Sequence, residues 1–170
     1  MTTSIKTSPK ERKLGFRVLF LAMFAIGTGQ TLFIAVLPPY ARGLGLSEVQ
    51  VGFIFSLSAL GWMMMSPFWG RKSDFIGRKS IIILGLLVYA FTTILMGLEF
   101  RLKELGYINL STLFGLLIFT RGCYGFLGSG AHSASMAYVA DRTTENERSG
   151  VMAVMGSAFA ISGIVGPGLA

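Results

Sequence analysis

One arginine, Arg121, lies inside a long stretch without other Lys, Arg, Asp or Glu and is the residue best placed to do chemistry in this chain. It lies about ten residues into the apolar run 110–138, hence roughly 15 Å deep if that run is a helix crossing a membrane. A charge at such depth costs about 2.5–3.5 kcal/mol on insertion scales, so it faces a cavity or a partner instead of lipid. A guanidinium in a cavity can bind an anionic substrate group, a carboxylate or an amide oxygen.

A second candidate is the charged segment 70–79, which separates two apolar runs and holds four cations around one carboxylate, Asp74. We expect Gly70 and Gly77 to permit tight turns at both ends of a loop. Cations such as Arg78, and free N–H groups at the start of the next helix, can hold the Asp74 carboxylate.

Polar residues also interrupt other apolar runs. Gln30 lies about eight residues inward from the outer end of the first run, a depth that matches that of Arg121 within roughly 3 Å. We therefore expect the Gln30 amide oxygen to accept a hydrogen bond from Arg121. His132 could titrate near neutral pH, although we interpret it as a structural residue whose hydrogen bonds are satisfied.

These residues must be positioned by membrane helices. Of 170 residues, 52% are hydrophobic and only 14% are charged, a composition too apolar for an ordinary soluble domain. We predict an all-α membrane protein in which Pro38-Pro39 ends the first helix and no Asp or Glu lies within a span. After a cytoplasmic tail, 1–15, comes a partial N-terminal bundle, 16–170, with spans at about 16–37, 51–69, 80–98, 110–138 and 150–170.

The distribution of positive charge predicts the orientation. The net charge is +7, but the cations lie in short segments between apolar runs and form no continuous patch, which argues against nucleic-acid binding. Eleven Lys and Arg residues fall in the tail and the two predicted inner loops, against three in the outer loops. This asymmetry predicts a cytoplasmic N-terminus.

Signatures of catalysis are missing from the sequence. There is no phosphate-binding Gly-x-x-x-x-Gly-Lys-Ser/Thr loop, no cluster with metal-ligand spacing and no paired-carboxylate site. We therefore expect no enzymatic activity, no cofactor and no metal.

The charged segment resembles the loop between the second and third helices of the major facilitator superfamily of secondary transporters. The pattern is Gly-x-x-x-Asp-x-x-Gly-Arg-Lys, and it falls on Gly70, Asp74, Gly77, Arg78 and Lys79. One position departs from it: Lys72, two residues after the first glycine, stands where that family usually has an apolar residue.

Two further segments resemble motifs of the same family. Arg121-x-x-Tyr124-Gly125 is similar to the fourth-helix motif Arg-x-x-Gln-Gly, with Tyr124 in place of glutamine, and the resemblance implies a part for Arg121 in proton transfer. Gly166-Pro167, with Ser162 where the family has glycine, resembles the fifth-helix motif of the antiporters.

The fifth run also carries a stripe of small residues, which we expect to pack against a neighbouring helix. In the inner loop before it, Asp141 and Glu147 are either solvated or, as the resemblance implies, in contact with other inner segments. The stripe consists of Ala153, Gly156, Ala160, Gly163 and Pro167.

The resemblance implies the N-terminal portion of a secondary active transporter that exports drugs or small molecules in exchange for protons. Its partners would be the lipid bilayer, a small-molecule substrate, protons and a C-terminal half that this chain lacks, in a membrane such as the bacterial inner membrane. A proton-coupled symporter for sugars or organic acids and a truncated, non-transporting membrane protein are the alternatives.

Overall fold

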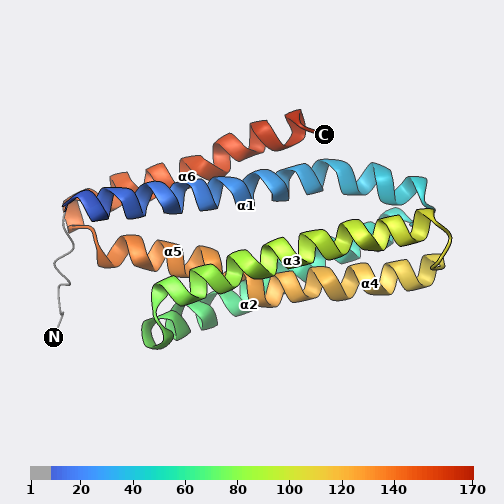
Figure 1. The fold of residues 1–170 in the computed structure, drawn as a ribbon, viewed down its shortest axis with the longest axis horizontal. Helices are drawn as coiled ribbons and strands as arrows, with labels where there is room; N and C mark the ends of the chain where they lie inside the picture. Colours follow the sequence, from blue (N-terminus) through green and yellow to red (C-terminus); the bar gives the residue numbers. More distant parts are fainter. Residues whose placement is uncertain (1–8) are drawn as a thin grey trace.

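The helices of this chain form an elongated antiparallel bundle (Figure 1), seen in a computed structural model that describes residues 9–170. A π-helical turn, η1 (Tyr124–Gly128), joins α4 to α5 within one continuous helix, so these residues hold five helices long and apolar enough to cross a membrane. The expected all-α membrane architecture is thereby confirmed. The helices are α1 (Pro9–Gly43), α2 (Glu48–Ile76), α3 (Arg78–Glu104), α4 (Leu110–Cys123), α5 (Ser129–Asp141) and α6 (Glu145–Gly168).

Polar residues in the turns satisfy N–H groups that a helix start leaves free. The Ser47 hydroxyl accepts from the Gln50 backbone N–H at 3.3 Å, and the Gln50 side chain accepts from the Ser47 N–H at 2.9 Å, which caps α2. Asn109 caps α4, because its side-chain oxygen accepts from the Thr112 N–H at 2.7 Å. These caps set where each helix begins.

Figure 1 shows α1 and α6 side by side, with α2, α3 and the α4–α5 helix forming the rest of the bundle. Small residues allow the close contacts. A Cβ atom on Gly166 of α6 would lie 2.0 Å from Oγ1 of Thr31 on α1, and one on Gly85 of α3 would lie 2.6 Å from Cβ of Ala131 on α5. The Thr31 hydroxyl also donates to the Ser162 carbonyl at 2.6 Å. Close packing and interhelical hydrogen bonds therefore hold the bundle together.

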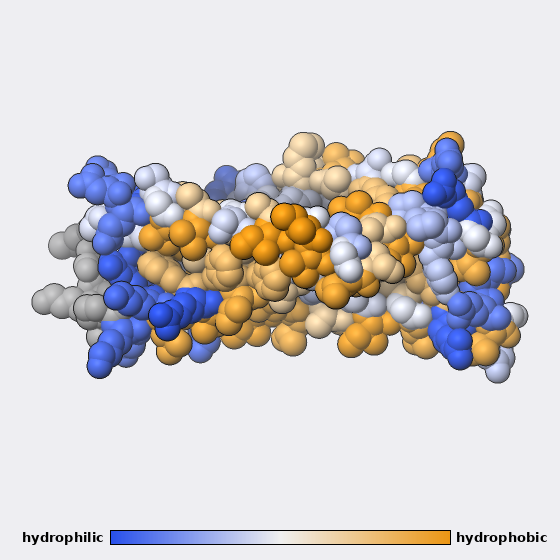
Figure 2. Space-filling model, turned by 90° about the horizontal axis from the view of Figure 1, so that it is seen from above, coloured by the Kyte–Doolittle hydropathy of each residue, from blue (hydrophilic) through white to orange (hydrophobic). Residues whose placement is uncertain are grey.

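Charged and apolar residues are segregated along the bundle axis. Figure 2 shows hydrophilic residues gathered at both ends and a broad apolar belt between them. Large side chains in the membrane helices point outward, among them Leu87, Ile94 and Ile164. Such a surface is unfavourable in water and matches the hydrocarbon core of a bilayer.

The charged segment 70–79 is not a loop, contrary to the expectation. α2 continues through Gly70, α3 starts at Arg78, and Gly77 is the one non-helical residue between them. Gly77 has a φ of 102°, a left-handed conformation that favours glycine, so the expected turn exists there. The turn expected at Gly70 is wrong: this residue is helical, and its carbonyl accepts from the Ser73 hydroxyl at 2.6 Å.

The first helix also extends beyond its predicted ends. It continues through Pro38 and Pro39 to Gly43, because the fixed φ of proline is compatible with a helix and freed carbonyls in membrane helices find other donors. At its start, residues 9–15 of the expected tail are already helical, whereas residues 1–8 lie outside the described residues.

The expected packing of the small-residue stripe on α6 is wrong for this chain. All five stripe residues are exposed, and a Cβ atom on Gly156 or Gly163 would meet no atom within 4 Å. α6 instead buries the neighbouring face, with Ser162 and Gly166 against α1. Packing of this face on α1 is favoured because the Ser162 hydroxyl donates to the Phe24 carbonyl of α1 at 3.0 Å. The stripe has no hydroxyl that could make this hydrogen bond.

Candidate functional site

Arg121 lies at the end of α4, and only 7% of its surface is exposed. Its Nη1 donates to Oε1 of Gln30 on α1 at 3.2 Å, so the contact expected from their matching depths is present. The guanidinium carbon lies 4.4 Å from the ring centre of Phe33 and 5.3 Å from that of Tyr124. Because aromatic faces attract cations most strongly where water is excluded, these rings and one amide oxygen hold the charge in place.

The π-helical turn η1 follows this arginine and shapes its surroundings, since such turns widen a helix locally and are frequent at functional sites. Gly125 lies against α2, where a Cβ atom would come within 2.5 Å of the Ser58 carbonyl oxygen. Tyr124 is buried, and its ring centre lies 5.7 Å from that of Tyr89 on α3. Tyr124 and Gly125 thus lie where α2, α3 and α4 meet.

The charge of Arg121 is not neutralised within the described part of the chain. No carboxylate of residues 9–170 lies within ion-pair distance of its guanidinium. Its Nε is buried without a hydrogen-bond partner among these residues, as is the hydroxyl oxygen of Tyr124. A buried guanidinium with an unpaired Nε–H, next to the unpaired Tyr124 hydroxyl, can donate to an added acceptor such as an anionic substrate group or a carboxylate.

His132 of α5 lies between two aromatic side chains. Its ring centre is 6.2 Å from that of Trp62 on α2 and 5.4 Å from that of Phe159 on α6. Its Nδ1 is buried and has no hydrogen-bond partner among residues 9–170, so the expectation that its hydrogen bonds are satisfied is wrong.

A cluster of ion pairs joins α2, α3 and α5 at the end of the bundle where α1 begins. Arg78 pairs with Asp74 on α2, and its Nε donates to Oδ2 of Asp141 on α5 at 2.9 Å. Its Nη1 donates to the Gly70 carbonyl at 3.1 Å. The expected Asp74–Arg78 contact is present, although Asp74 lies in the last turn of α2, not at the start of α3. Lys79 is exposed beside this cluster.

Another ion pair at the same end joins α1 to α6, where Arg12 lies 3.3 Å from Glu147. Of the two alternatives for the inner acids, contact with other segments therefore holds for both Asp141 and Glu147.

Glu99 is a buried carboxylate that the sequence interpretation missed. It was expected in an outer loop, but α3 continues to Glu104 and Glu99 is only 2% exposed. Its Oε1 is hydrogen-bonded to the hydroxyl of Thr120 on α4. The expectation that no acid lies in a membrane helix is therefore wrong. Leu98 and Phe100, the apolar residues on either side, were a signal that the helix does not end at the first charge.

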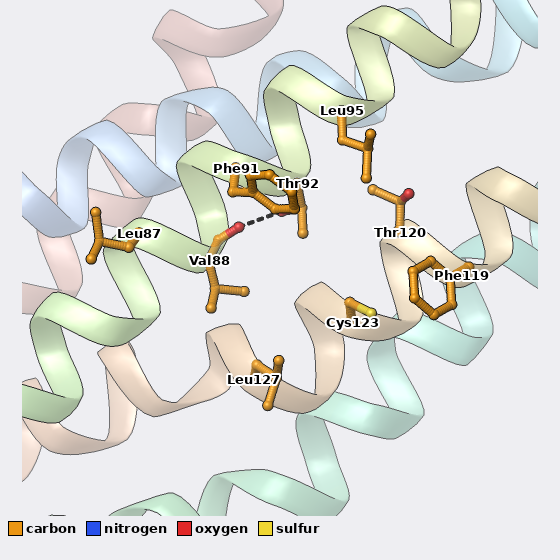
Figure 3. Close-up of a pocket in the computed structure, with 9 residues that line it drawn as sticks. All are labelled: Leu87, Val88, Phe91, Thr92, Leu95, Phe119, Thr120, Cys123 and Leu127. Carbon is orange, nitrogen blue, oxygen red and sulfur yellow. Dashed lines mark hydrogen bonds between the residues drawn. The ribbon is translucent and has the colours of Figure 1, made fainter.

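An apolar groove of about 370 Å³ lies between α3 and α4 (Figure 3). Leu87 and Phe91 of α3 and Phe119 of α4 line it and are largely exposed, so the groove opens toward the membrane. It lies apart from the rings around Arg121, and we assign no function to it. The described residues, 9–170, contain no group of three or more His, Cys, Asp or Glu side chains that could hold a metal ion.

Comparison with known proteins places these features in a family. Residues 19–170 match the model of the Major Facilitator Superfamily. Multidrug resistance protein 2 of Bacillus subtilis (strain 168) is 33% identical over 164 residues, which are 96% of this chain and 38% of the relative. Multidrug resistance protein 1 of the same strain is 30% identical over 151 residues, 89% of this chain and 35% of the relative.

A third relative, quinolone resistance protein NorA of Staphylococcus aureus, is 26% identical over 152 residues, which are 89% of this chain and 36% of the relative. The chain thus spans little more than a third of the length of these relatives. The resemblance to the drug-exporting branch, drawn above from three short motifs, is confirmed by these matches. With a family match over most of its length and five helices able to span a membrane, the chain belongs to the Major Facilitator Superfamily.

Proposed function

We propose that this chain is the N-terminal portion of a secondary transporter that exports drugs or other small molecules in exchange for protons. The observation that carries the proposal is the buried, unneutralised Arg121, held by Gln30 and aromatic rings inside a membrane bundle of this family. The names of the relatives supply the substrate class: two are multidrug resistance proteins and one is a quinolone resistance protein.

Arg121 is proposed to receive the substrate or a coupling group. Transporters of this kind bind substrate near the membrane midplane, between two halves. The unpaired Nε–H of Arg121 can donate either to a carboxylate from the C-terminal half or to an anionic substrate group, such as the carboxylate of a quinolone. Gln30 and Tyr124 orient the guanidinium, and Gly125 lets the turn η1 lie close to α2.

The ion pairs around Arg78 are proposed to act as a conformational switch. Gly77 is the one non-helical residue between α2 and α3, so a relative movement of the two helices is concentrated there. Such a movement changes the distances from Arg78 to Asp74 and Asp141, which lie on separate helices. We propose that these ion pairs form when this end of the bundle is closed and break when it opens during alternating access.

The open stripe on α6 is proposed to face the C-terminal half. It exposes Gly163 and Pro167, while the neighbouring face of α6, with Gly166, packs on α1. The cation distribution supports a cytoplasmic N-terminus, and the bacterial origin of the relatives supports a bacterial inner membrane. We place the hydrocarbon core over the five predicted spans, with the third extended to include Glu99, and the turns outside it.

Everted membrane vesicles containing the full-length protein test this function. A quinolone should accumulate in the vesicles when a proton gradient, acid inside, is imposed, and should leak out when a protonophore collapses the gradient. Accumulation driven by protons moving in the same direction as the solute would instead identify a symporter. Absence of any gradient-driven flux, with the protein folded in the membrane, would contradict a transport function.

A further inference from the structure

A carboxylic acid, Glu99, is buried between α3 and α4, and the transport cycle proposed above does not use it. Its Oε1 is hydrogen-bonded to the Thr120 hydroxyl, whereas its Oε2 is buried and has no hydrogen-bond partner among residues 9–170. A carboxylate normally accepts several hydrogen bonds. This one is held by a single neutral hydroxyl.

The helix faces that enclose this pair are apolar. Met96 precedes Glu99 by one turn on the buried face of α3 and belongs to one hydrophobic cluster with Leu113 and Leu117. These two leucines precede Thr120 on the buried face of α4. The carboxyl group therefore lies next to a hydrophobic cluster, where an ionised form is poorly solvated.

Among the described residues, no cation makes an ion pair with Glu99. Lys103, one turn further along α3, lies beyond ion-pair distance. On α4, Arg121 follows Thr120 in sequence, but its guanidinium is directed at Gln30.

The other neighbouring elements offer no partner either. α2 has no titratable residue between Glu48 and Arg71. On α1, the hydroxyl of Tyr40 is hydrogen-bonded to Glu104 in the last turn of α3. Arg101, two residues after Glu99, is exposed and also pairs with Glu104, at 3.1 Å.

We propose that Glu99 is a proton-binding site of this bundle. The carboxylate takes up one proton when the α3–α4 contact is hydrated, and the neutral acid is then buried between the helices. When it is ionised, Thr120 donates to Oε1. When it is protonated, the acid donates to Thr120 Oγ1, whose own hydroxyl hydrogen turns to a backbone carbonyl of α4. Each state thus keeps a hydrogen bond, and only a proton is exchanged with water.

The position of Glu99 indicates the side from which the proton comes. It lies five residues before the end of α3, about 7.5 Å along the helix. That end is opposite the one where α1 begins, which we place in the cytoplasm (Figure 1). Proton uptake is therefore from the external side. This assignment of the side from which the proton comes rests on the proposed exchange with protons.

Infrared difference spectroscopy of the full-length protein in lipid nanodiscs at neutral pH tests the protonation directly. The unsubstituted protein should show one more protonated-carboxyl C=O band than Glu99→Gln, and that band should shift in Thr120→Val, which removes the hydrogen bond. The matched control is Glu104→Gln, an exposed acid on the same helix, which should leave the band unchanged. Identical C=O spectra of the unsubstituted protein and folded Glu99→Gln would overturn the proposal.

Transport in everted vesicles separates this site from the wider function. Glu99→Gln should abolish the dependence of quinolone flux on the pH inside the vesicle, the side that corresponds to the cell exterior, whereas Glu104→Gln should keep it. Unchanged pH dependence in Glu99→Gln would refute the role of the site in coupling. If the unsubstituted protein shows no gradient-driven flux, the exchange function fails, while the infrared band still decides whether Glu99 binds a proton.

Discussion

Two glycines of α6, three residues apart, should respond in opposite ways to the same substitution. A Cβ atom on Gly166 would lie 2.0 Å from Thr31 Oγ1 and 2.7 Å from the Leu32 backbone nitrogen, so α1 must move away from α6. A Cβ atom on Gly163 would meet nothing within 4 Å. Gly166→Ala should therefore destabilise the bundle, whereas Gly163→Ala should not.

The magnitude follows from the kind of contact. Forcing extra atoms into a packed site costs about 1–3 kcal/mol, and moving α1 also lengthens the 2.6 Å hydrogen bond from Thr31 to the Ser162 carbonyl. At the open position, alanine in place of glycine favours a helix by up to about 1 kcal/mol. Because both positions are helical, this gain applies to both variants and cancels in the comparison, so they should differ by roughly 1–3 kcal/mol in the free energy of unfolding.

Reversible unfolding of this 170-residue chain in mixed micelles, followed by circular dichroism, measures this difference, because Gly163 is open in this chain. Equal stability of the two variants would refute the assignment of the buried face of α6. A larger loss for Gly163→Ala would show instead that the stripe is the packed surface, as the sequence alone suggested.

Two other predictions concern the end of the bundle where α1 begins. Asp74→Asn should slow transport by a few-fold while leaving substrate affinity unchanged. It removes one partly exposed ion pair with Arg78, and such a pair contributes about 0.2–1 kcal/mol. A large loss of affinity at unchanged turnover would contradict the switch role. After replacement of Cys123, a cysteine at Phe75, which is 88% exposed at the end of α2, should resist a membrane-impermeant thiol reagent added to intact cells, and a cysteine at Gly106 should react with it. Labelling of Phe75→Cys from outside would reverse the orientation.

The sequence was a good guide wherever one residue type has one physical solution. Gly77 was expected in a turn, and its positive φ requires a residue without a side chain. The Gln30–Arg121 contact was expected because a charge inside a membrane needs an acceptor and the two depths agree. The depth argument needs only the helical rise, which holds for any straight helix.

It was a poor guide where several faces of a helix are equally apolar. α6 has small residues on two faces, and only the hydrogen bond from Ser162 to Phe24 of α1 distinguishes the packed one. Glu99 was assigned to a loop because the first charge was taken as the helix end, although a buried hydroxyl from Thr120 allows the helix to continue. The π-helical turn Tyr124–Gly128 has no simple sequence signal, and in the fold its residues Gly125 and Tyr124 contact α2 and α3.

The most direct test of the central claim, that the buried Arg121 drives coupled transport, is proton-driven quinolone flux in the Arg121→Lys variant. Lysine keeps the charge but loses the planar fork that bonds Gln30 and stacks on Phe33. A hydrogen bond to a charged group contributes about 1.5–3 kcal/mol, so flux should fall at least about tenfold. Arg42→Lys, an exposed arginine paired with Glu48, is the control and should transport normally. Undiminished flux in folded Arg121→Lys would contradict the account.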